Sequence, residues 1–407
     1  MDRAQERWLG RQDSNLGMAV PKTAALPLGD APKPVEATAP CYTETPHLCN
    51  TKLTDMPTGA DAVGVYSGRR CVGVSTGNTP WYVSMNTERR ETFVTEDRTA
   101  ARRRVAVLMA VRDGELFLVQ QLASLARQRS VDVDLWISDD GSRDASLDIV
   151  RRAAATWGLG RVRLLDGPRQ GFAENFRSLM TRAEIEADCY AFCDQDDVWE
   201  EDKLAHAVAW LETQPAHRPA LYCSRTRIIS CDGKTIDHSP LFSRAPSFRN
   251  AIVQSIAGGN TMVMNRAARN LLLEASRRTG FVSHDWWCYL MVSGAGGSVH
   301  YCPDPRIGYR QHEDNLVGQN NTWRARMSRL HHLVRGRFKD WNDKNIAGLE
   351  LCEDLLTVDS RRVLAHFSDS RRRKLPGRLL SLWRSGAYRQ TAIGELGLYV
   401  ACVIGRL

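Results

Sequence analysis

Residues 189–199 read Cys-Tyr-Ala-Phe-Cys-Asp-Gln-Asp-Asp-Val-Trp. The apolar first half predicts a buried strand, and Asp194, Asp196 and Asp197 crowd into four residues where that strand should end. Neighbouring carboxylates repel one another and are costly to desolvate unless a cation compensates them. Because hard oxygen ligands on a loop suit Mg²⁺ or Mn²⁺, the segment predicts a divalent metal site. The alternative is an acidic turn in which Asp197 only caps a following helix.

Strand-like and helix-like segments alternate along the chain around this acidic cluster. Strands are predicted at 105–111, 133–138, 162–165 and 188–193. Helices are predicted at 115–128, from the loop 139–144 to about residue 157, at 171–183 and at 200–212. This alternation predicts a parallel sheet with helices on both faces. The first helix has Leu116, Val119, Leu122 and Leu125 at helical spacing. Ligands of such sheets bind beyond the carboxyl ends of the strands, where the acidic loops 139–144 and 194–197 both lie.

The net charge of +8 belongs to the C-terminal part of the chain. Residues 321–407 contain 17 Lys or Arg and 8 Asp or Glu, whereas residues 1–320 contain 38 and 39. Leucines and Trp383 are interleaved with the basic residues, which predicts basic amphipathic helices that can lie on an anionic membrane surface. Solvated or domain-packing helices are the first alternative. Nucleic acid is disfavoured, because no zinc-finger, helix-turn-helix or RNA-recognition motif accompanies the basic residues.

Cysteine spacing and hydropathy favour a cytoplasmic protein. The 11 cysteines include no CxxC pair, which favours reduced thiols over a disulfide framework. No apolar run reaches the roughly 18–20 residues that span a bilayer, and no secretory signal is recognisable. Residues 1–100 are rich in Pro, Gly, Thr and Ala, which predicts disorder. Residues 10–30 look like conceptual translation across a transfer-RNA gene, so we expect the natural start downstream, with Met85 the best candidate.

Seven short segments, taken in order, carry a resemblance to a known family. They are VAVLMAVRDGE (105–115), ISDDGSRD (137–144), GFAENF (171–176), DQDDVW (194–199), GGNTMVMN (258–265), HDWW (284–287) and YRQH (309–312). Together they resemble the inverting family 2 glycosyltransferases with the GT-A fold, and among these the rhamnosyltransferase-like members that build surface polysaccharide. The resemblance implies an α/β, Rossmann-like, mixed and mostly parallel sheet at 101–320, followed by a helical segment at 321–407.

The resemblance assigns donor-binding roles to several of these residues. Asp140 matches the carboxylate that accepts a hydrogen bond from the ring N–H of a pyrimidine, although it could instead serve turn and helix capping. Arg112 and Asp113 stand where the family often has an aromatic residue and Asn beside the base. Arg169 matches a position suited to the diphosphate, with plain surface solvation as its alternative. Asp194 is expected at the sugar or behind the metal ligands.

The cation and catalytic roles follow in the same way. Asp196 and Asp197 are expected nearest the ribose and the cation, and His312 is a further candidate ligand that could equally be structural. Asp285 matches the catalytic base, with the N-cap of a helix starting at Trp286 as its alternative role. Three further residues are candidates: Trp286 and Trp287 line the sugar site or pack in the core, and Arg310 meets the diphosphate.

These expectations combine into one predicted activity. The enzyme would use Mg²⁺ or Mn²⁺ and a dTDP- or UDP-sugar, with dTDP-rhamnose suggested by the resemblance. It would invert the anomeric centre as one sugar passes to a hydroxyl. The acceptor would be a glycan or lipid-linked molecule of cell-surface polysaccharide synthesis, met at the inner face of the cell membrane. The first alternative is a sugar-1-phosphate nucleotidyltransferase, which normally has a Gly-rich loop with Arg and Lys that residues 110–114 lack. The second is a non-catalytic nucleotide-sugar-binding module.

Overall fold

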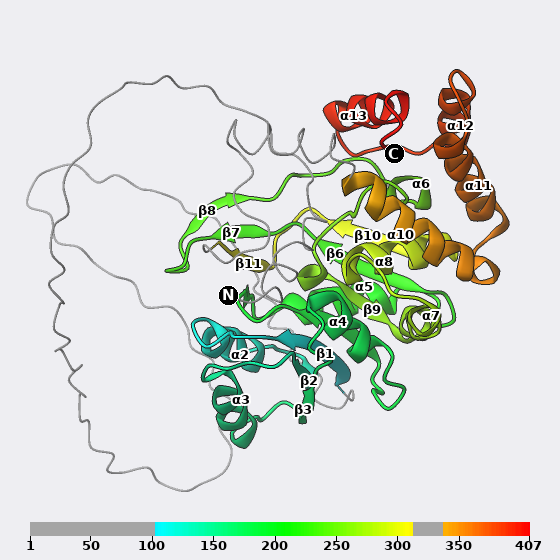
Figure 1. Cartoon of the computed structure of the whole chain (residues 1–407). Helices are drawn as coiled ribbons and strands as arrows, with labels where there is room; N and C mark the ends of the chain where they lie inside the picture. Colours follow the sequence, from blue (N-terminus) through cyan, green and yellow to red (C-terminus); the bar gives the residue numbers. More distant parts are fainter. Residues whose placement is uncertain (1–101, 312–336) are drawn as a thin grey trace, which may run out of the picture. The chain divides into compact units, whose positions relative to one another are not determined.

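The computed structural model describes residues 102–311 and 337–407, and a seven-stranded sheet forms its centre (Figure 1). The strand order is β10-β6-β9-β4-β1-β2-β3. Only β9 runs antiparallel to its neighbours, so the sheet is mixed and mostly parallel, as predicted. The strands are β1 (Arg103–Val111), β2 (Val131–Asp139), β3 (Val162–Asp166), β4 (Cys189–Cys193), β6 (Ala220–Ser224), β9 (Val263–Asn265) and β10 (Ser298–Cys302).

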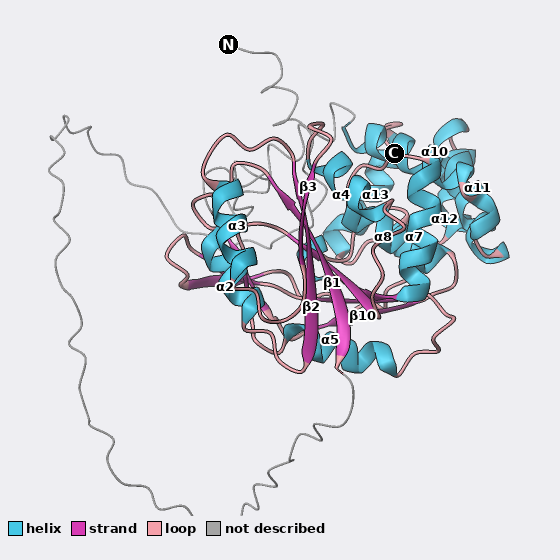
Figure 2. Ribbon diagram, turned by 90° about the horizontal axis from the view of Figure 1, so that it is seen from below, coloured by secondary structure: helices cyan, strands magenta, loops and turns pink. Residues whose placement is uncertain are grey.

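Helices cover both faces of this sheet because the side chains of each central strand alternate between two apolar cores. In β1, Ala106 and Leu108 join one core, whereas Val105 and Val107 join the other. Figure 2 shows α2 and α3 on one side of the strands and α4, α7 and α8 on the other. The helices are α2 (Leu118–Ala126), α3 (Ser146–Ala155), α4 (Phe172–Met180), α5 (Lys203–Glu212), α6 (Phe248–Ala251), α7 (Arg266–Arg278) and α8 (His284–Gly294).

Helix α2 corrects part of the predicted apolar stripe. Leu122 and Leu125 are buried as expected, but Leu116 is 73% exposed and Val119 is 57% exposed. Leu116 precedes the helix, and the residue that completes the buried stripe is Leu118. The prediction was wrong at these two positions for different reasons. Leu116 lies before the helix begins, and Val119 lies off the buried stripe because residues spaced by three drift around a helix of 3.6 residues per turn.

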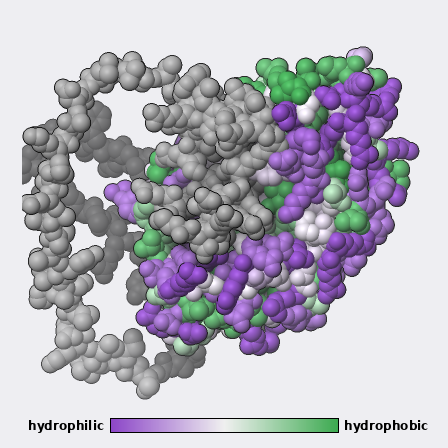
Figure 3. All heavy atoms as spheres, in the orientation of Figure 1, coloured by the Kyte–Doolittle hydropathy of each residue, from purple (hydrophilic) through white to green (hydrophobic). Residues whose placement is uncertain are grey.

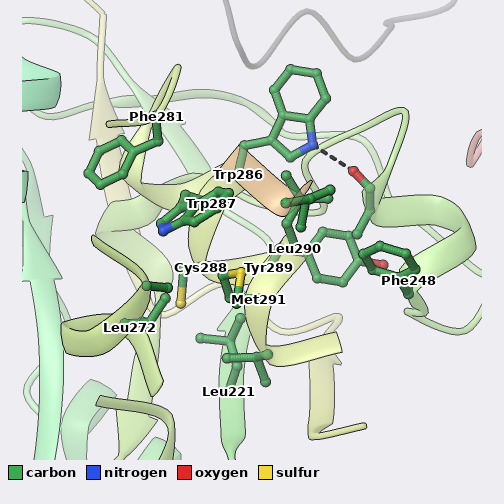
Figure 4. Packing of buried hydrophobic residues seen from close by; sticks show 14 of the residues in the cluster. Leu221, Phe248, Leu272, Phe281, Trp286, Trp287, Cys288, Tyr289, Leu290 and Met291 are labelled. Carbon is green, nitrogen blue, oxygen red and sulfur yellow. Dashed lines mark hydrogen bonds between the residues drawn. The ribbon is translucent and has the colours of Figure 1, made fainter. Parts of the chain in front are cut away.

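Helix α8 is buried along nearly its whole length, as Figure 4 shows for its packing. Trp286 is 2% exposed and donates its indole N–H to the Ala251 carbonyl at 2.6 Å. Trp287 is fully buried, with Phe281 stacked 6.4 Å away. Both indoles are therefore core residues, and the alternative placement of either beside the sugar loses support.

A second, four-stranded sheet was not foreseen from the sequence. Its order is β5-β11-β7-β8, and β11 pairs parallel to β7 and antiparallel to β5. The pairing of β5 with β11 brings Trp199, which follows the acidic residues, beside Ile307. The end of the acidic segment is therefore held in a sheet. Its strands are β5 (Val198–Trp199), β7 (Arg227–Ile229), β8 (Thr235–His238) and β11 (Ile307–Arg310), and a short 3-10 helix, η2, spans Gly259–Thr261.

The C-terminal helices pack on the apolar core that lies on the α7 and α8 side of the main sheet. Leu364, Leu382 and Leu398 belong to the same buried cluster as α7 and α8. Arg249 forms two hydrogen bonds of 3.0 Å with the carboxylate of Asp359, which fixes the layer from outside. These helices are α10 (Arg337–Leu351), α11 (Val358–Arg372), α12 (Gly377–Ser385) and α13 (Ala392–Val403), with the 3-10 helix η3 at Glu353–Leu355.

Three predictions fall on parts of the chain that the structure does not describe. Residues 1–100, for which disorder was expected, lie outside the described ranges, as do the predicted domain boundary at residue 320 and His312. Among the described helices, none combines the length and apolar character that crossing a membrane requires.

Candidate active site

The loops that follow β1 and β2 are joined by hydrogen bonds from backbone to side chain. The Asp113 N–H donates to Ser142 Oγ at 2.9 Å, and the Arg143 N–H donates to Asp113 Oδ1 at 2.7 Å. The Gly114 N–H donates to Ser146 Oγ at 2.8 Å. Asp113, predicted to bind the donor, thus uses one carboxylate oxygen to hold the neighbouring loop. The loops at the ends of β1 and β2 (residues 112–115 and 139–146) therefore form one connected edge of the sheet, which we call the rim.

Gln195 attaches the acidic loop, residues 194–197, to that rim. Its Oε1 accepts from the Arg112 N–H at 2.8 Å, and its Nε2 donates to the Arg112 carbonyl at 3.0 Å. A Cβ on Gly114 would lie 2.7 Å from Gln195 Cδ, so glycine is needed for this approach. This contact could not be predicted from local patterns, because Gln195 and Arg112 lie 83 residues apart in the chain.

Asp140 holds a third loop, which follows β3 and leads into α4. Asp140 Oδ1 accepts from the Arg169 N–H at 2.6 Å, and Oδ2 accepts from the Gly171 N–H at 2.8 Å. Arg112 Nη1 lies 3.9 Å from the same Oδ2. Asp140 is only 2% exposed. Each carboxylate oxygen has a second lone pair, so Asp140 keeps the capacity to accept from a ligand.

Capping of the turn at residues 141–142, which was the alternative role of Asp140, is performed by Asp139 instead. Asp139 Oδ2 accepts from the Gly141 N–H at 3.1 Å and from the Ser142 N–H at 3.0 Å. Asp139 Oδ1 is buried and has no hydrogen-bond partner among the described residues. Asp139 is therefore a polar residue of this rim that the sequence interpretation missed, although it stands directly beside Asp140.

The three carboxylates of the acidic loop differ in burial. Asp194 and Asp196 are half-buried, whereas Asp197 is fully buried. Loss of surrounding water, with the nearby charges of Asp196 and Asp285, raises the pKa of Asp194 to about 7. Burial, followed by the charges of Asp196 and Asp194, also raises the pKa of Asp197. The loop thus concentrates negative charge in a poorly hydrated place.

Asp197 is committed to internal hydrogen bonds. Its Oδ2 accepts from Asn260 Nδ2 at 2.6 Å, and its Oδ1 accepts from the Arg310 N–H at 3.4 Å. Asn260 belongs to η2, the turn at the predicted Gly-Gly-Asn loop. The following helix, α5, begins after Asp202, so the reading of Asp197 as a helix cap is wrong. We interpret Asp197 as a residue that positions the acidic loop.

Arg310 is buried beneath the loop and bonded to several of its neighbours. Its Nε donates to the Asp196 carbonyl at 3.0 Å, and its Nη2 donates to Gln120 Oε1 at 2.6 Å. Its guanidinium lies 4.7 Å from the ring centre of Phe117. Arg310 is 1% exposed. Its expected contact with a diphosphate therefore gives way to a structural role under the acidic loop. Arg169, by contrast, is exposed.

Asp285 stands in the first turn of α8, next to the acidic loop. The helix begins at His284 after Ser283, so Asp285 is not its N-cap. Asp285 is 4% exposed, its Oδ2 accepts from Ser255 Oγ at 3.5 Å, and its Oδ1 has no hydrogen-bond partner within the described residues. Burial raises the pKa of Asp285. Because its charge also acts on Asp194, the two lie within electrostatic reach of one another.

His284 is a further residue of this region whose role the sequence did not reveal. Its ring stacks on Phe176 with 3.7 Å between centroids and meets Phe192 edge-on at 4.8 Å. Burial lowers the pKa of His284 to about 3, so the ring is neutral. A Cβ on Gly259 would lie 1.9 Å from His284 Nε2. The aromatic packing of His284 therefore fixes the start of α8 and, with it, Asp285.

The acidic loop offers a partial donor set for a divalent ion. Within residues 102–311 and 337–407, no three His, Cys, Asp or Glu side chains are grouped closely enough to hold a metal by themselves. Mg²⁺ is commonly held by one or two carboxylates together with substrate phosphates and water. Asp194 and Asp196 are both half-buried, and the charge of one acts on the other. They therefore fit a site in which two carboxylates hold the ion together with phosphates and water.

Part of the chain matches a known protein family, and a relative is known by name. Residues 106–272 match the family described as glycosyl transferase family 2. A relative named dTDP-rhamnosyl transferase RfbG, from Shigella flexneri, is 26% identical over 238 residues, which cover 56% of this chain and 80% of that protein. These matches leave the nucleotidyltransferase and the non-catalytic module without support.

Solved structures also resemble the chain, at low similarity. S. aureus TarS 1-349 in complex with UDP-GlcNAc has 13% identity and a TM-score of 0.43, and covers 70% of this chain and 89% of its own. The mannosyltransferase PcManGT from Pyrobaculum calidifontis, in complex with GDP-Man and Mn²⁺, has 15% identity and a TM-score of 0.39, with coverages of 75% and 87%. Similarities of this size carry no argument about the ligands of this chain.

Proposed function

The chain is a glycosyltransferase with a family 2 domain, and on that premise we propose that it transfers one rhamnose from a nucleoside diphosphate to an acceptor hydroxyl with inversion. The relative that is named a dTDP-rhamnosyl transferase supports the choice of rhamnose and of dTDP over UDP. The observation that carries the proposal is the position of Asp285. A buried carboxylate with a raised pKa and an unbonded oxygen lies in electrostatic reach of the acidic loop.

In this proposal Asp285 is the general base. Its Oδ1 accepts the acceptor's hydroxyl proton while the hydroxyl oxygen attacks the anomeric carbon from the face opposite the diphosphate. The bond from that carbon to the diphosphate oxygen breaks, and the diphosphate leaves with the electron pair. A raised pKa suits a base, because it increases the affinity of the carboxylate for the proton.

The donor would lie along the joined rim. Asp140 would accept from the pyrimidine N–H through a remaining lone pair, beside Arg112 and Asp113. The exposed guanidinium of Arg169 would meet the diphosphate, since it stands at the entry to α4, where backbone N–H groups favour anions. This part of the proposal is supported by the fixed geometry of the three loops.

The proposed cation is Mg²⁺ or Mn²⁺, held by Asp196 and Asp194 with the donor's phosphates. Bound there, it would neutralise the charge that develops on the leaving diphosphate. Asp197 would orient these ligands through Asn260 instead of binding the ion directly. His312 remains a candidate ligand of the same ion by the family resemblance.

A donor panel tests this function. Purified protein would be titrated with dTDP-rhamnose, UDP-glucose and UDP-N-acetylglucosamine, with Mn²⁺ or with EDTA, by calorimetry, because binding can be read without knowing the acceptor. We expect dTDP-rhamnose to bind most tightly and EDTA to weaken it. Tight binding of a UDP-sugar instead would reject the donor assignment, and equal binding in EDTA would reject the cation.

The Asp285→Asn variant separates binding from chemistry. Loss of the base should lower the rate of sugar transfer to extracted bacterial glycans or lipid-linked acceptors by about 10²–10⁴-fold, while donor affinity stays within about threefold. Asp148→Asn is the matched control, since Asp148 is exposed on α3 and bonds Arg151. Transfer at the wild-type rate by Asp285→Asn would remove Asp285 from the proposed role.

A further inference from the structure

Helix α13 presents an apolar face to solvent. Its exposed positions form one stripe at helical spacing: Ile393 is 68% exposed, Leu396 66% and Val400 44%, followed by Val403 at 45% and Ile404 at 50%. Figure 3 shows hydrophobic side chains gathered over this helix. We call these five residues the α13 outer face. Water-facing stripes of this length normally carry charges, so the face calls for a partner.

The opposite side of α13 is firmly attached, so the outer face is a fixed surface. Leu398, Ala401 and Cys402 are buried in the apolar core. Arg378 of α12 donates to the Cys402 carbonyl at 3.2 Å and to the Val403 carbonyl at 3.4 Å. The helix cannot turn its apolar stripe inward without breaking these contacts.

Helix α12, which contacts α13, also exposes two apolar residues. Trp383 is 68% exposed and Leu380 is 46% exposed, one helical turn apart on the helix that Arg378 joins to α13. An exposed indole suits the boundary between lipid headgroups and acyl chains, because it is both apolar and able to donate a hydrogen bond.

The charges around the outer face favour one occupant. Residues 371–407 contain eight Lys or Arg and one acid, Glu395. Three of the eight, Arg371, Arg372 and Arg373, form ion pairs with carboxylates of α10 and α11, so the basic character of this surface depends on the others. Glu395 is directed to the protein, where its Oε2 accepts from the Arg389 N–H at 2.7 Å. Lys374, Arg384 and Arg406 are exposed. Two copies of this chain meeting through the face would bring basic rims together, whereas an anionic lipid surface complements them.

We propose that the α13 outer face, with Trp383 and Leu380, docks the enzyme on an anionic lipid bilayer. The helix would lie in the headgroup region with its apolar stripe turned to the acyl chains and the basic side chains on the phosphates. No described helix is suited to cross the membrane, so the attachment is peripheral. This surface lies outside the residues assigned to sugar transfer and does not depend on that function.

Vesicle sedimentation tests the proposal with the full chain. We expect binding to vesicles of phosphatidylcholine with about one third phosphatidylglycerol, weaker binding to phosphatidylcholine alone, and a decrease with added salt. The triple variant Ile393→Gln, Leu396→Gln, Val400→Gln should bind about tenfold or more weakly, because the apolar contact is lost. The matched control is Ile236→Gln with Leu241→Gln, which changes two apolar residues that are 48% and 57% exposed elsewhere.

A second measurement uses the wild-type protein, so that the proposal can be tested even if the triple variant misfolds. Amide hydrogen exchange of residues 392–404 in the wild type should slow in the presence of the anionic vesicles and should slow less with the neutral ones. Equal vesicle binding by the triple variant and the wild type would overturn the proposal. A wild-type dimer that the triple variant converts to monomers, without vesicle binding by either, would also overturn it and would identify a second copy as the occupant.

Discussion

The acidic rim of the main sheet and the outer face of α13 depart from the usual distribution of side chains in opposite directions. At the rim, polar groups are buried: Asp140, Asp197 and Arg310 are each at most 2% exposed. On α13, Ile393 and Leu396 are about two-thirds exposed. Polar groups normally face water and large apolar ones the core. The rim is held by hydrogen bonds between loops, whereas the outer face is left open to solvent, and this difference is what we expect of the two surfaces that we propose.

The two surfaces should also differ in how much stability their residues provide. Rim residues bond to backbone groups of other loops, so removing one leaves a buried donor or acceptor unsatisfied. Outer-face residues touch mostly water, so removing one leaves little behind. The variants below test this contrast, beginning with the residue expected to matter most.

Arg310→Ala should cause the largest loss. It leaves the Asp196 carbonyl and Gln120 Oε1 without their donor and empties the space beneath the acidic loop. We expect the free energy of unfolding, measured in urea, to fall by about 3–5 kcal/mol. Arg163→Ala, at an exposed position of β3, should change it by less than about 0.5 kcal/mol. Similar values for the two variants would contradict the structural role of Arg310.

Asn260→Ala should weaken cation binding more than it weakens the fold. The Asp197 carboxylate loses its 2.6 Å donor and with it a fixed orientation. Residues that orient metal ligands typically contribute about 10–100-fold to affinity, so Mn²⁺ titration in the presence of donor should show a loss of that size. Gln214→Ala, at the end of α5, is the control. Unchanged Mn²⁺ affinity in Asn260→Ala would mean that Asp197 does not position the site.

The rim shows which parts of the site a sequence can predict. The acidic loop could be singled out because it lies at a readable boundary, the end of an apolar strand. Asp285 was assigned through the family resemblance, and no local pattern marked it. Gln195 and Asn260 were not predicted as bonded residues, because their partners lie 83 and 63 residues away and no local pattern encodes such a contact. Residues whose partners are distant in the chain need the fold before a role can be assigned.

The fold, like the site, was predictable where local sequence patterns determine it and not where distant contacts do. The parallel half of the sheet was predicted from alternating apolar runs, since burial on both faces makes those runs continuous. The second sheet was missed because β5 has two residues and β7 three, too few to show a period. The start of α2 was misplaced because Leu116 continues the apolar spacing although it precedes the helix. Short elements and element ends are decided by tertiary contacts.

His284 should make stability depend on acid. Its folded pKa of about 3 lies below the unfolded value of about 6.5, because burial opposes the charged form. The folded state therefore keeps a neutral ring while the unfolded state takes up a proton. The contribution of His284 to the free energy of unfolding is fully present above about pH 6.5. Between about pH 6.5 and pH 3 it decreases by about 1.4 kcal/mol for each unit by which the pH falls. His284→Gln should show a shallower decline, whereas exposed His217→Gln should retain the wild-type slope.

Leu396→Ala should have the smallest effect, and its neighbour on α13 provides the comparison. Leu396 is 66% exposed and Leu398 is 1% exposed, so the same substitution removes the same atoms from opposite sides of one helix. Leu398→Ala should lower the free energy of unfolding by about 2–5 kcal/mol because it opens a cavity in the core. Leu396→Ala should lower it by less than about 0.5 kcal/mol in urea denaturation without vesicles. A large loss at Leu396 would mean that the outer face is part of the fold's own core, and the contrast between the two surfaces would then fail.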